Sequence, residues 1–293
     1  MHMSKEKKKK TEIEKKSEPR ALNTAGGYLA DRERMLKDLE QLTLLSDVFM
    51  SVVLSDLGAC QHVVRILTGD HEIRLKSVRT QYVISKAVTR GARLDVLAEE
   101  QNGMLYHLEI ENTDTVDHPR RTRFYGALTD GELLRKGADY GGLPDRRIFY
   151  ISRTDIWKQG YTVYEEEKRF RQTGLLHEDG AHVTYVNAAI DDGSRTAKMM
   201  SYFRTADPFD DSEGELSKRV RFLKTEEGGR EIMCEIMERI REEGRKEGRK
   251  SGLLESSRKT ALNLNRMGMP EETIARAVEE DVMVVRQWLK SAK

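Results

Sequence analysis

The chain has 293 residues, of which 38% are hydrophobic and 34% charged, and this length fits one large domain or one medium domain with appendages. Lys and Arg number 51 against 50 Asp and Glu, so the net charge of +1 excludes a uniformly basic coat for nucleic acid and leaves only local patches. No window reaches the roughly 18 consecutive apolar residues of a membrane span, and no apolar segment marks the N-terminus as a secretory signal. Cys60 and Cys234 are too few for a disulfide framework or a zinc site. We therefore expect a cytoplasmic protein without membrane contact.

The N-terminal third begins with a tail and continues into helices. Residues 1–27 predict a disordered basic tail, because residues 7–10 are all lysine and residues 23–27 end in Gly-Gly. The main domain is expected over residues 28–225. Leucines at helical spacing predict a helix over residues 32–57, and a second, short helix is expected over residues 62–67.

A β-hairpin is the strongest local prediction of the sequence. Residues 93–100 and 104–111 are strand-like runs separated by Gln-Asn-Gly, and an Asn-Gly pair between two such runs favours a hairpin. If the turn centres on Asn102-Gly103, the numbers of paired residues sum to about 205. That register sets Asp95 opposite Ile110.

Strands and helices alternate after the hairpin. A helix is expected over residues 119–136, with Pro at its start and Gly137 beyond its end. Residues 147–152 and 182–187 read as buried strands, and residues 195–204 as a helix. This order predicts an α/β core in which helices flank a mixed sheet.

The C-terminal part changes in character. Residues 226–252 are dense in charge and predict a solvated helix that frays into a linker. Residues 253–293 predict a small tail of three helices. Two interpretations of this tail stay open: a helix-turn-helix that reads DNA through residues 282–290, and a module for docking or homo-oligomerisation.

The hairpin also carries a cluster of carboxylates. Asp95 lies in its first strand, and Glu109 and Glu111 share one face of the second because side chains alternate along a strand. Carboxylates on neighbouring strands repel one another, and an oxygen-ligated Mg²⁺ or Mn²⁺ would neutralise that repulsion. The alternative interpretation is a half-exposed hairpin whose charges are simply solvated.

The chain resembles the PD-(D/E)XK nuclease family transposases, a group that includes the recombination-promoting nucleases. The resemblance covers residues 42–290. Its main motif is the hairpin of residues 93–112, with an apolar-flanked Asp, an Asn-Gly turn and a Glu-x-Glu strand where the family has Glu-x-Gln or Glu-x-Lys. The other matching segments are residues 46–49, Arg121 with Phe124-Tyr125, residues 136–140 before the strand 148–151, Val186-Asn187, and the Leu-Asn-Leu-Asn-Arg-Met-Gly-Met-Pro tail.

The resemblance implies a restriction-endonuclease-like core with a C-terminal helical tail and the activity of a metal-dependent DNA endonuclease. Asp95 and Glu109 would then hold Mg²⁺ or Mn²⁺, and Asp47 matches a position that adds a carboxylate. Glu111 stands where the family has Gln or Lys, and it would act as a further ligand or base or would weaken the site.

The resemblance also implies a phosphate contact from the arginines that follow the hairpin, which are Arg120, Arg121 and Arg123. Pairing of these arginines with Asp114 and Asp117 is the alternative. At the level of function, the rival to the endonuclease is a catalytically weakened relative that binds DNA or a protein, and a third hypothesis is an oligomeric scaffold assembled by the C-terminal helices.

Overall fold

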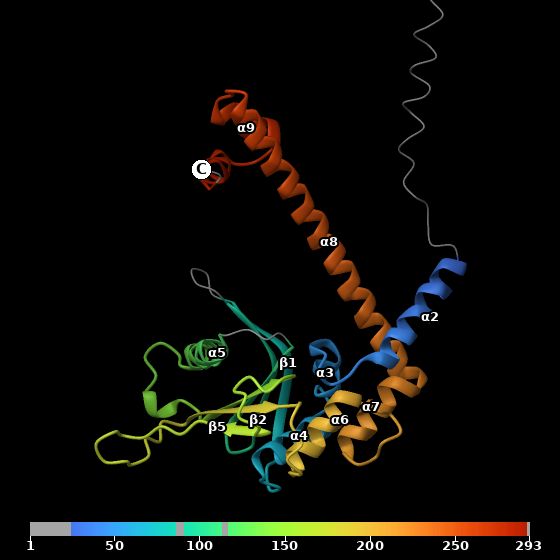
Figure 1. Ribbon diagram of the computed structural model, residues 1–293, viewed down its shortest axis with the longest axis vertical. Helices are drawn as coiled ribbons and strands as arrows, with labels where there is room; N and C mark the ends of the chain where they lie inside the picture. Colours follow the sequence, from blue (N-terminus) through green and yellow to red (C-terminus); the bar gives the residue numbers. More distant parts are fainter. Residues whose placement is uncertain (1–24, 86–90, 113–116, 292–293) are drawn as a thin grey trace, which may run out of the picture. The chain divides into compact units, whose positions relative to one another are not determined.

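The computed structural model describes residues 25–85, 91–112 and 117–291, so residues 1–24 of the expected tail lie outside the described ranges. The chain forms two compact units, Met1–Glu231 and Ile232–Lys293. The first unit contains the sheet and most of the helices, and the second contains three helices (Figure 1).

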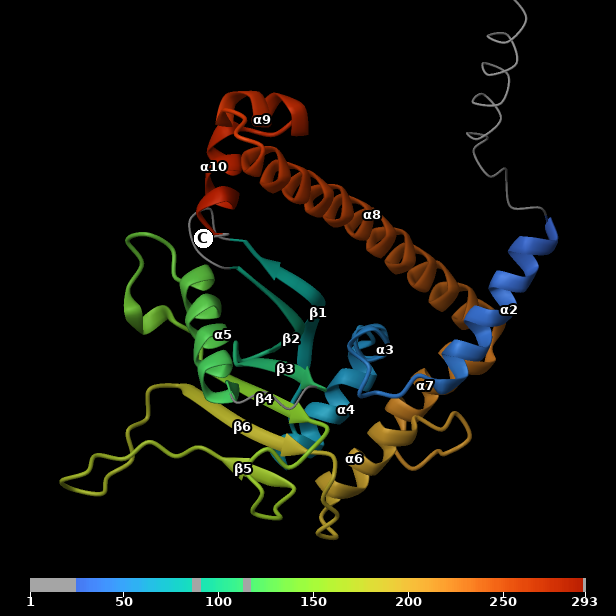
Figure 2. The same ribbon diagram turned by 45° about the horizontal axis from the view of Figure 1, so that its top comes forward.

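The first unit is built on a six-stranded mixed sheet with the strand order β1-β2-β3-β4-β6-β5 (Figure 2). β1, β2 and β3 form an antiparallel meander, β3, β4 and β6 run parallel, and β5 is antiparallel to β6. The strands are β1 (Leu75–Ile84), β2 (Ala92–Glu100), β3 (Leu105–Glu111), β4 (Arg146–Ser152), β5 (Val163–Glu165) and β6 (Ala181–Asn187). This confirms the predicted mixed α/β architecture with helices flanking the sheet.

Helices cover both faces of the sheet. α5 (His118–Leu133) lies on one face, and α3 (Asp47–Val53) and α4 (Leu57–Thr68) lie on the other, packed against α6 (Arg195–Thr205) and α7 (Glu215–Thr225) (Figures 1 and 2). All of β3 is buried as a result. Leu108 and Ile110 point toward α3 and α4, because their neighbours along the strand contact α5 and side chains alternate.

The helix predicted over residues 32–57 is wrong as a single element. α2 (Ala25–Gln41) ends before Leu42, and the Leu44 N–H donates to the Phe203 carbonyl at 3.0 Å, which takes the chain out of the helix before α3 begins. Asp56 then caps α4 by accepting from the Ala59 N–H at 2.9 Å. All these segments bury apolar residues, so helical spacing alone did not reveal the breaks.

The predicted hairpin is confirmed, but its register differs by one residue. Glu99 pairs with Leu105 and Val96 with Leu108. The Glu100 N–H donates to the Met104 carbonyl at 2.9 Å, so the loop is centred on Asn102, and Gly103 takes a φ of +95°. Continued by one residue, this register sets Asp95 opposite Glu109 instead of Ile110.

Several other elements differ from the sequence prediction. β1, β5 and α7 were not predicted, and β1 escaped notice because its many polar residues, such as Lys76, hide the alternation of this edge strand. α8 (Glu227–Arg266) is one continuous helix of 40 residues, so the expected linker up to residue 252 is helical. Glu, Lys and Arg are good helix formers, which explains why charge density did not end the helix.

The second unit confirms the predicted C-terminal helices. α9 (Glu271–Val278) and α10 (Val282–Lys290) pack on the end of α8 around a small core of Ala261, Ile274, Ala275, Val278, Val285 and Leu289. Arg286 of α10, the helix that would read DNA, pairs with Glu271 of α9 at 2.8 Å. DNA reading and oligomerisation by these helices stay predictions.

Membrane-spanning length was tested for the helices in the described ranges. No single helix among them is long and apolar enough to cross a membrane, whereas α3 and α4, bent by 108° at their junction, pass together by length and composition.

Candidate active site

Strands β2 and β3 separate next to the candidate carboxylates, and we call this point the fork. The β2–β3 ladder ends at Val96 and Leu108, while β2 continues along β1 and β3 continues along β4. Beyond this point the Ile110 N–H donates to Asp95 Oδ2 at 3.0 Å, so a carboxylate takes the place of a ladder carbonyl. The fork therefore fixes the Asp95 side chain beside β3.

Glu109 lies next to Asp95 in this fork. Its Oε2 accepts weakly from the Asp95 N–H at 3.4 Å and lies 2.8 Å from His107 Nε2. Asp95 is 8% exposed and Glu109 is 3% exposed. Asp95 and Glu109, which the sequence predicted to share a site, thus lie side by side and are almost fully buried.

The electrostatic consequence falls on Asp95. Burial raises the pKa of its carboxyl to about 7, and the charges of Glu109 and, further away, Asp47 act in the same direction. The Ile110 N–H and His107 oppose the rise without cancelling it. Ionising Asp95 near neutral pH is therefore unfavourable in this site, and a cation beside the carboxylate would make it less so.

Gln81, on the neighbouring strand β1, lies beside the Asp95 carboxylate. Its backbone φ is +52°, a left-handed conformation that is uncommon for a residue with a side chain. Its Nε2 lies 3.5 Å from Asp95 Oδ1. Such backbone strain is enriched at functional sites, and here it occurs directly opposite the candidate ligand.

The donor set fits a metal that keeps much of its own hydration. Within the described ranges, no group of three or more His, Cys, Asp or Glu side chains is arranged to hold a metal ion. Asp47 is exposed at the start of α3 and reaches Asp95 only through its charge. Asp95 and Glu109 remain, and Mg²⁺ commonly binds through one or two carboxylates together with water and substrate phosphate.

Glu111, the third predicted carboxylate, has a different partner. It is 5% exposed and forms an ion pair with Arg121 of α5. The Tyr150 hydroxyl of β4 also donates to its Oε2 at 3.1 Å. The strand alternation that placed Glu111 on the face of Glu109 is confirmed, but its carboxylate binds a guanidinium of this chain.

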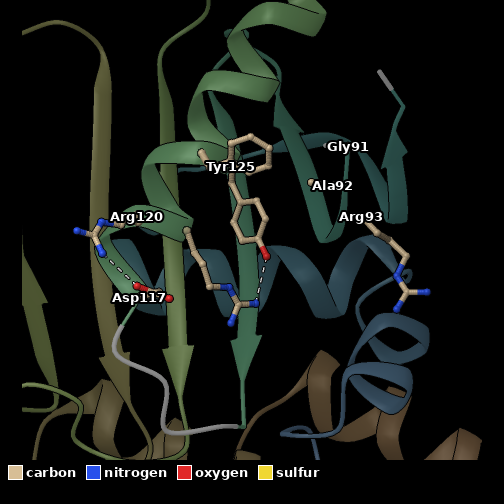
Figure 3. A pocket seen from close by; sticks show the side chains of 8 residues that line it. Gly91, Ala92, Arg93, Asp117, Arg120 and Tyr125 are labelled. Atoms are coloured by element: carbon tan, nitrogen blue, oxygen red, sulfur yellow. Dashed lines mark hydrogen bonds and ion pairs between the residues drawn. The ribbon is translucent and has the colours of Figure 1, made fainter. Parts of the chain in front are cut away.

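A pocket of about 750 Å³ opens between the start of β2 and the first turns of α5. Figure 3 shows the side chains around it, which include Arg93, Arg120, Arg121 and Tyr125. Its guanidinium groups outnumber its one acidic residue, Asp117, which pairs with Arg120 at 3.3 Å. The pocket is therefore basic.

The predicted arginines take three different positions. Arg121 lines the pocket and is ion-paired with Glu111. Arg120 lines it too, and its pair with Asp117 confirms half of the alternative interpretation, while Asp114 lies outside the described residues. Arg123 is exposed on α5 and is not among the lining residues.

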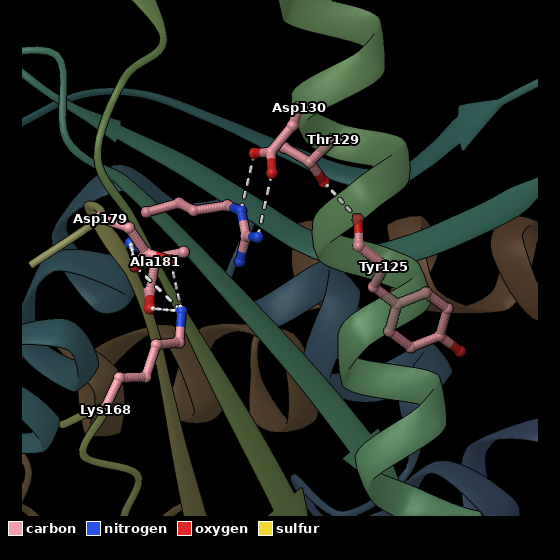
Figure 4. A network of polar contacts seen from close by, with 7 residues as sticks. Tyr125, Thr129, Asp130, Lys168, Asp179 and Ala181 are labelled. Atoms are coloured by element: carbon pink, nitrogen blue, oxygen red, sulfur yellow. Dashed lines mark hydrogen bonds and ion pairs between the residues drawn. The ribbon is translucent and has the colours of Figure 1, made fainter. Parts of the chain in front are cut away.

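α5 is anchored over the sheet at its far end. Asp130 accepts from Arg146 Nε at 2.8 Å and from its Nη2 at 3.1 Å, a bidentate pair between α5 and β4 (Figure 4). Gly126 makes this approach possible, because a Cβ there would lie 2.4 Å from the Arg146 guanidinium. This ion pair fixes the position of α5, and so of Arg121, relative to β4.

Sequence reasoning missed three residues of this site. His107 was not recognised as a partner of Glu109, although its position two residues earlier on the same strand gives it the same face. Arg93 has the same parity as Asp95, and this spacing was a usable signal. Tyr150 lies on a different strand, and only the parallel pairing of Glu109 with Tyr150 brings it to the site.

Comparison of the chain with family models, with curated proteins and with solved structures gives no match.

Proposed function

We propose that this chain is a metal-dependent DNA endonuclease with a restriction-endonuclease-like core, as its resemblance to the PD-(D/E)XK nuclease family transposases implies. Asp95 and Glu109 would hold Mg²⁺ or Mn²⁺. The ion would ionise a water and stabilise the charge that develops on a phosphodiester as it is hydrolysed.

One observation carries the proposal: two buried carboxylates, Asp95 and Glu109, face each other in the fork, and among the described residues no Lys or Arg side chain forms an ion pair with either of them. Burial and mutual repulsion raise the pKa of Asp95 to about 7, which makes the apo site costly above neutral pH. Structural carboxylates are normally paired when buried. A carboxylate pair with a raised pKa next to a basic pocket is a candidate ion site.

The basic pocket supplies the second part of the support. Arg93 is two residues from Asp95 on β2, and Arg121 contacts Glu111, which is two residues from Glu109 on β3. Guanidinium groups bind phosphate through paired N–H donors. A DNA backbone lying in the pocket would therefore bring a phosphodiester close to the carboxylate pair.

A specific observation also favours the alternative, a catalytically weakened relative that binds DNA or a protein. Glu111 occupies the position of the family's Gln or Lys, and its carboxylate is engaged by Arg121 and Tyr150. If the site lacks a group that stabilises the transition state, the fold would retain binding without cleavage.

A plasmid assay separates the two functions. Supercoiled DNA is incubated with the full chain in Mg²⁺ or Mn²⁺, and Asp95→Asn and Glu109→Gln serve as matched variants that remove charge but keep volume. The proposed nuclease nicks the plasmid, and both variants lose at least 100-fold in rate. Binding of DNA by all three proteins without nicking in either metal would support the binding module instead.

A further inference from the structure

Glu111 is surrounded by groups that stabilise its negative charge without a metal. It forms its ion pair with Arg121, and it accepts from the Tyr150 hydroxyl at 3.1 Å. That hydroxyl also lies 2.9 Å from His118 Nδ1 at the start of α5. The contacts connect β3 and β4 to the first turn of α5.

Arg121 is correspondingly held in one conformation. Besides its pair with Glu111, its Nη2 donates to the Tyr125 hydroxyl at 3.1 Å. Its guanidinium carbon lies 5.8 Å from the ring centre of Tyr125 and 5.9 Å from that of Tyr150. A free arginine side chain has many rotamers and loses that freedom when it binds a ligand. These contacts remove that freedom before any ligand binds.

The held guanidinium is still accessible. The Arg121 side chain is 36% exposed, whereas that of Glu111 is 6% exposed. Arg121 also lines the basic pocket, which Glu111 does not. The carboxylate is thus buried, while the arginine that it pairs with is partly exposed and lines the pocket.

We infer that Glu111 is a positioning residue, which acts by holding Arg121 as the fixed cation of the site, and that it is not a metal ligand. This inference rests on the proposed function. A guanidinium fixed in advance stabilises developing negative charge without reorganisation during the reaction. The acidic residue in the position of the family's Gln or Lys is then a part of the cation site, since it is what holds the arginine.

A double-mutant cycle tests whether Glu111 acts through Arg121. The variants are Glu111→Gln, Arg121→Gln and the double variant, with Arg120→Gln as a matched control because that arginine lines the same pocket but pairs at the surface. Three quantities are measured: Mg²⁺ affinity by calorimetry, affinity for a fluorescent 12-nucleotide DNA duplex in Ca²⁺, and kcat and KM for nicking.

We expect Glu111→Gln to leave Mg²⁺ affinity within about twofold of wild type, since no ligand is lost. It should lower DNA affinity about threefold and kcat about tenfold, less than the roughly 100-fold or more for the loss of an aligned donor, because Arg121 itself remains. The double variant should equal Arg121→Gln, because Glu111 has no effect without its partner. Tyr150→Phe removes one hydrogen bond to Glu111, keeps every charge, and should lower kcat about threefold.

Any of four results would overturn the inference. A loss of Mg²⁺ affinity of tenfold or more in Glu111→Gln would make Glu111 a ligand. A gain in DNA affinity or in cleavage rate, or additive losses in the double variant, would show that its negative charge acts on the substrate independently of Arg121.

The proposed function can fail separately. If wild type binds DNA but nicks nothing, the nuclease proposal is wrong, and the cycle in DNA affinity still decides the role of Glu111.

Discussion

Two buried carboxylate sites in the same unit have opposite electrostatics. Glu213, just before α7, is 2% exposed, about as buried as Glu109, yet its pKa is lowered. Burial by itself would raise that pKa, but hydrogen bonds and charge from His62 and Arg195 outweigh it. At the β2–β3 fork, burial and repulsion raise the pKa of Asp95 instead.

The difference lies in the partners that the fold provides. Arg195 contacts both oxygens of Glu213, at 2.8 and 2.6 Å, and His62 Nε2 lies 2.9 Å from Oε2. These residues begin α6 and lie within α4, so the carboxylate joins three helices. At the fork, His107 Nε2 contacts Glu109 Oε2 at 2.8 Å, while Asp95 is held by the Ile110 N–H and by Gln81 Nε2. The bidentate pair of Glu213 with Arg195 fits a structural role, whereas the raised pKa of Asp95 supports the proposed ion site.

Removing the structural carboxylate should have the largest effect. We expect Glu213→Gln to lower the free energy of unfolding by about 3 kcal/mol at neutral pH, the lower end for a broken buried pair because Arg195 is partly exposed and can turn to water. A depressed pKa contributes stability above the unfolded value of 4.5, and this is lost as pH falls. Urea unfolding should therefore show a much smaller difference at about pH 3. An equal loss at both pH values would contradict an ionic role.

Removing charge from the fork should have the opposite sign. Asp95 has a pKa raised from 3.8 to about 7, so the apo protein is most stable below the lower value and loses stability as pH rises through the higher one. We expect Asp95→Asn to raise the free energy of unfolding by about 2 kcal/mol at about pH 8 in the absence of metal, and to leave it unchanged at about pH 3. Destabilisation at the higher pH would mean that the carboxylate is needed by the apo fold.

The affinity for Mg²⁺ should depend on the protonation of Asp95. Mg²⁺ must displace the proton held at Asp95, so its affinity should rise about tenfold per pH unit below about pH 7 and level off above it. Calorimetry in two buffers of different ionisation enthalpy measures the released proton directly. An affinity that is independent of pH between about 5 and 8 would place the metal elsewhere.

Partly exposed ion pairs should contribute least to the free energy of unfolding. Asp130 is 37% exposed in its bidentate pair with Arg146, so Asp130→Asn should cost about 1 kcal/mol at most. Asp117→Asn, in the more exposed pair with Arg120, should cost close to nothing. Thermal unfolding of both variants checks this order, and a cost for Asp130→Asn as large as that for Glu213→Gln would remove the link between burial and effect.

Local signals in the sequence were enough to predict β2 and β3, the two strands that carry the site. The Asn-Gly turn and the alternation of Glu109 and Glu111 placed those side chains on a hairpin, and the carboxylates of Asp95 and Glu109 do meet there. The register was off by one because the loop has three residues instead of two, and composition does not distinguish the two lengths.

The rest of the site depends on contacts between distant segments. The ion pair of Glu111 with Arg121 forms only if α5 has the right position over the sheet. The pair of Asp130 with Arg146 helps to fix that position. Glu213 was passed over because its partners His62 and Arg195 are 151 and 18 residues away in the chain. Only the packing of α4, α6 and α7 brings them together.

The central claim is that the Asp95–Glu109 pair binds a divalent metal whereas the equally buried Glu213 does not. Calorimetric titration of Mg²⁺ into wild type, Asp95→Ala, Glu109→Ala and Glu213→Gln at about pH 8 tests it directly. Wild type and Glu213→Gln should bind with equal affinity, and each alanine variant should lose at least about 100-fold while remaining folded, since one of two protein ligands is gone. If either alanine variant binds Mg²⁺ as wild type does, the fork is not the metal site and the account is wrong.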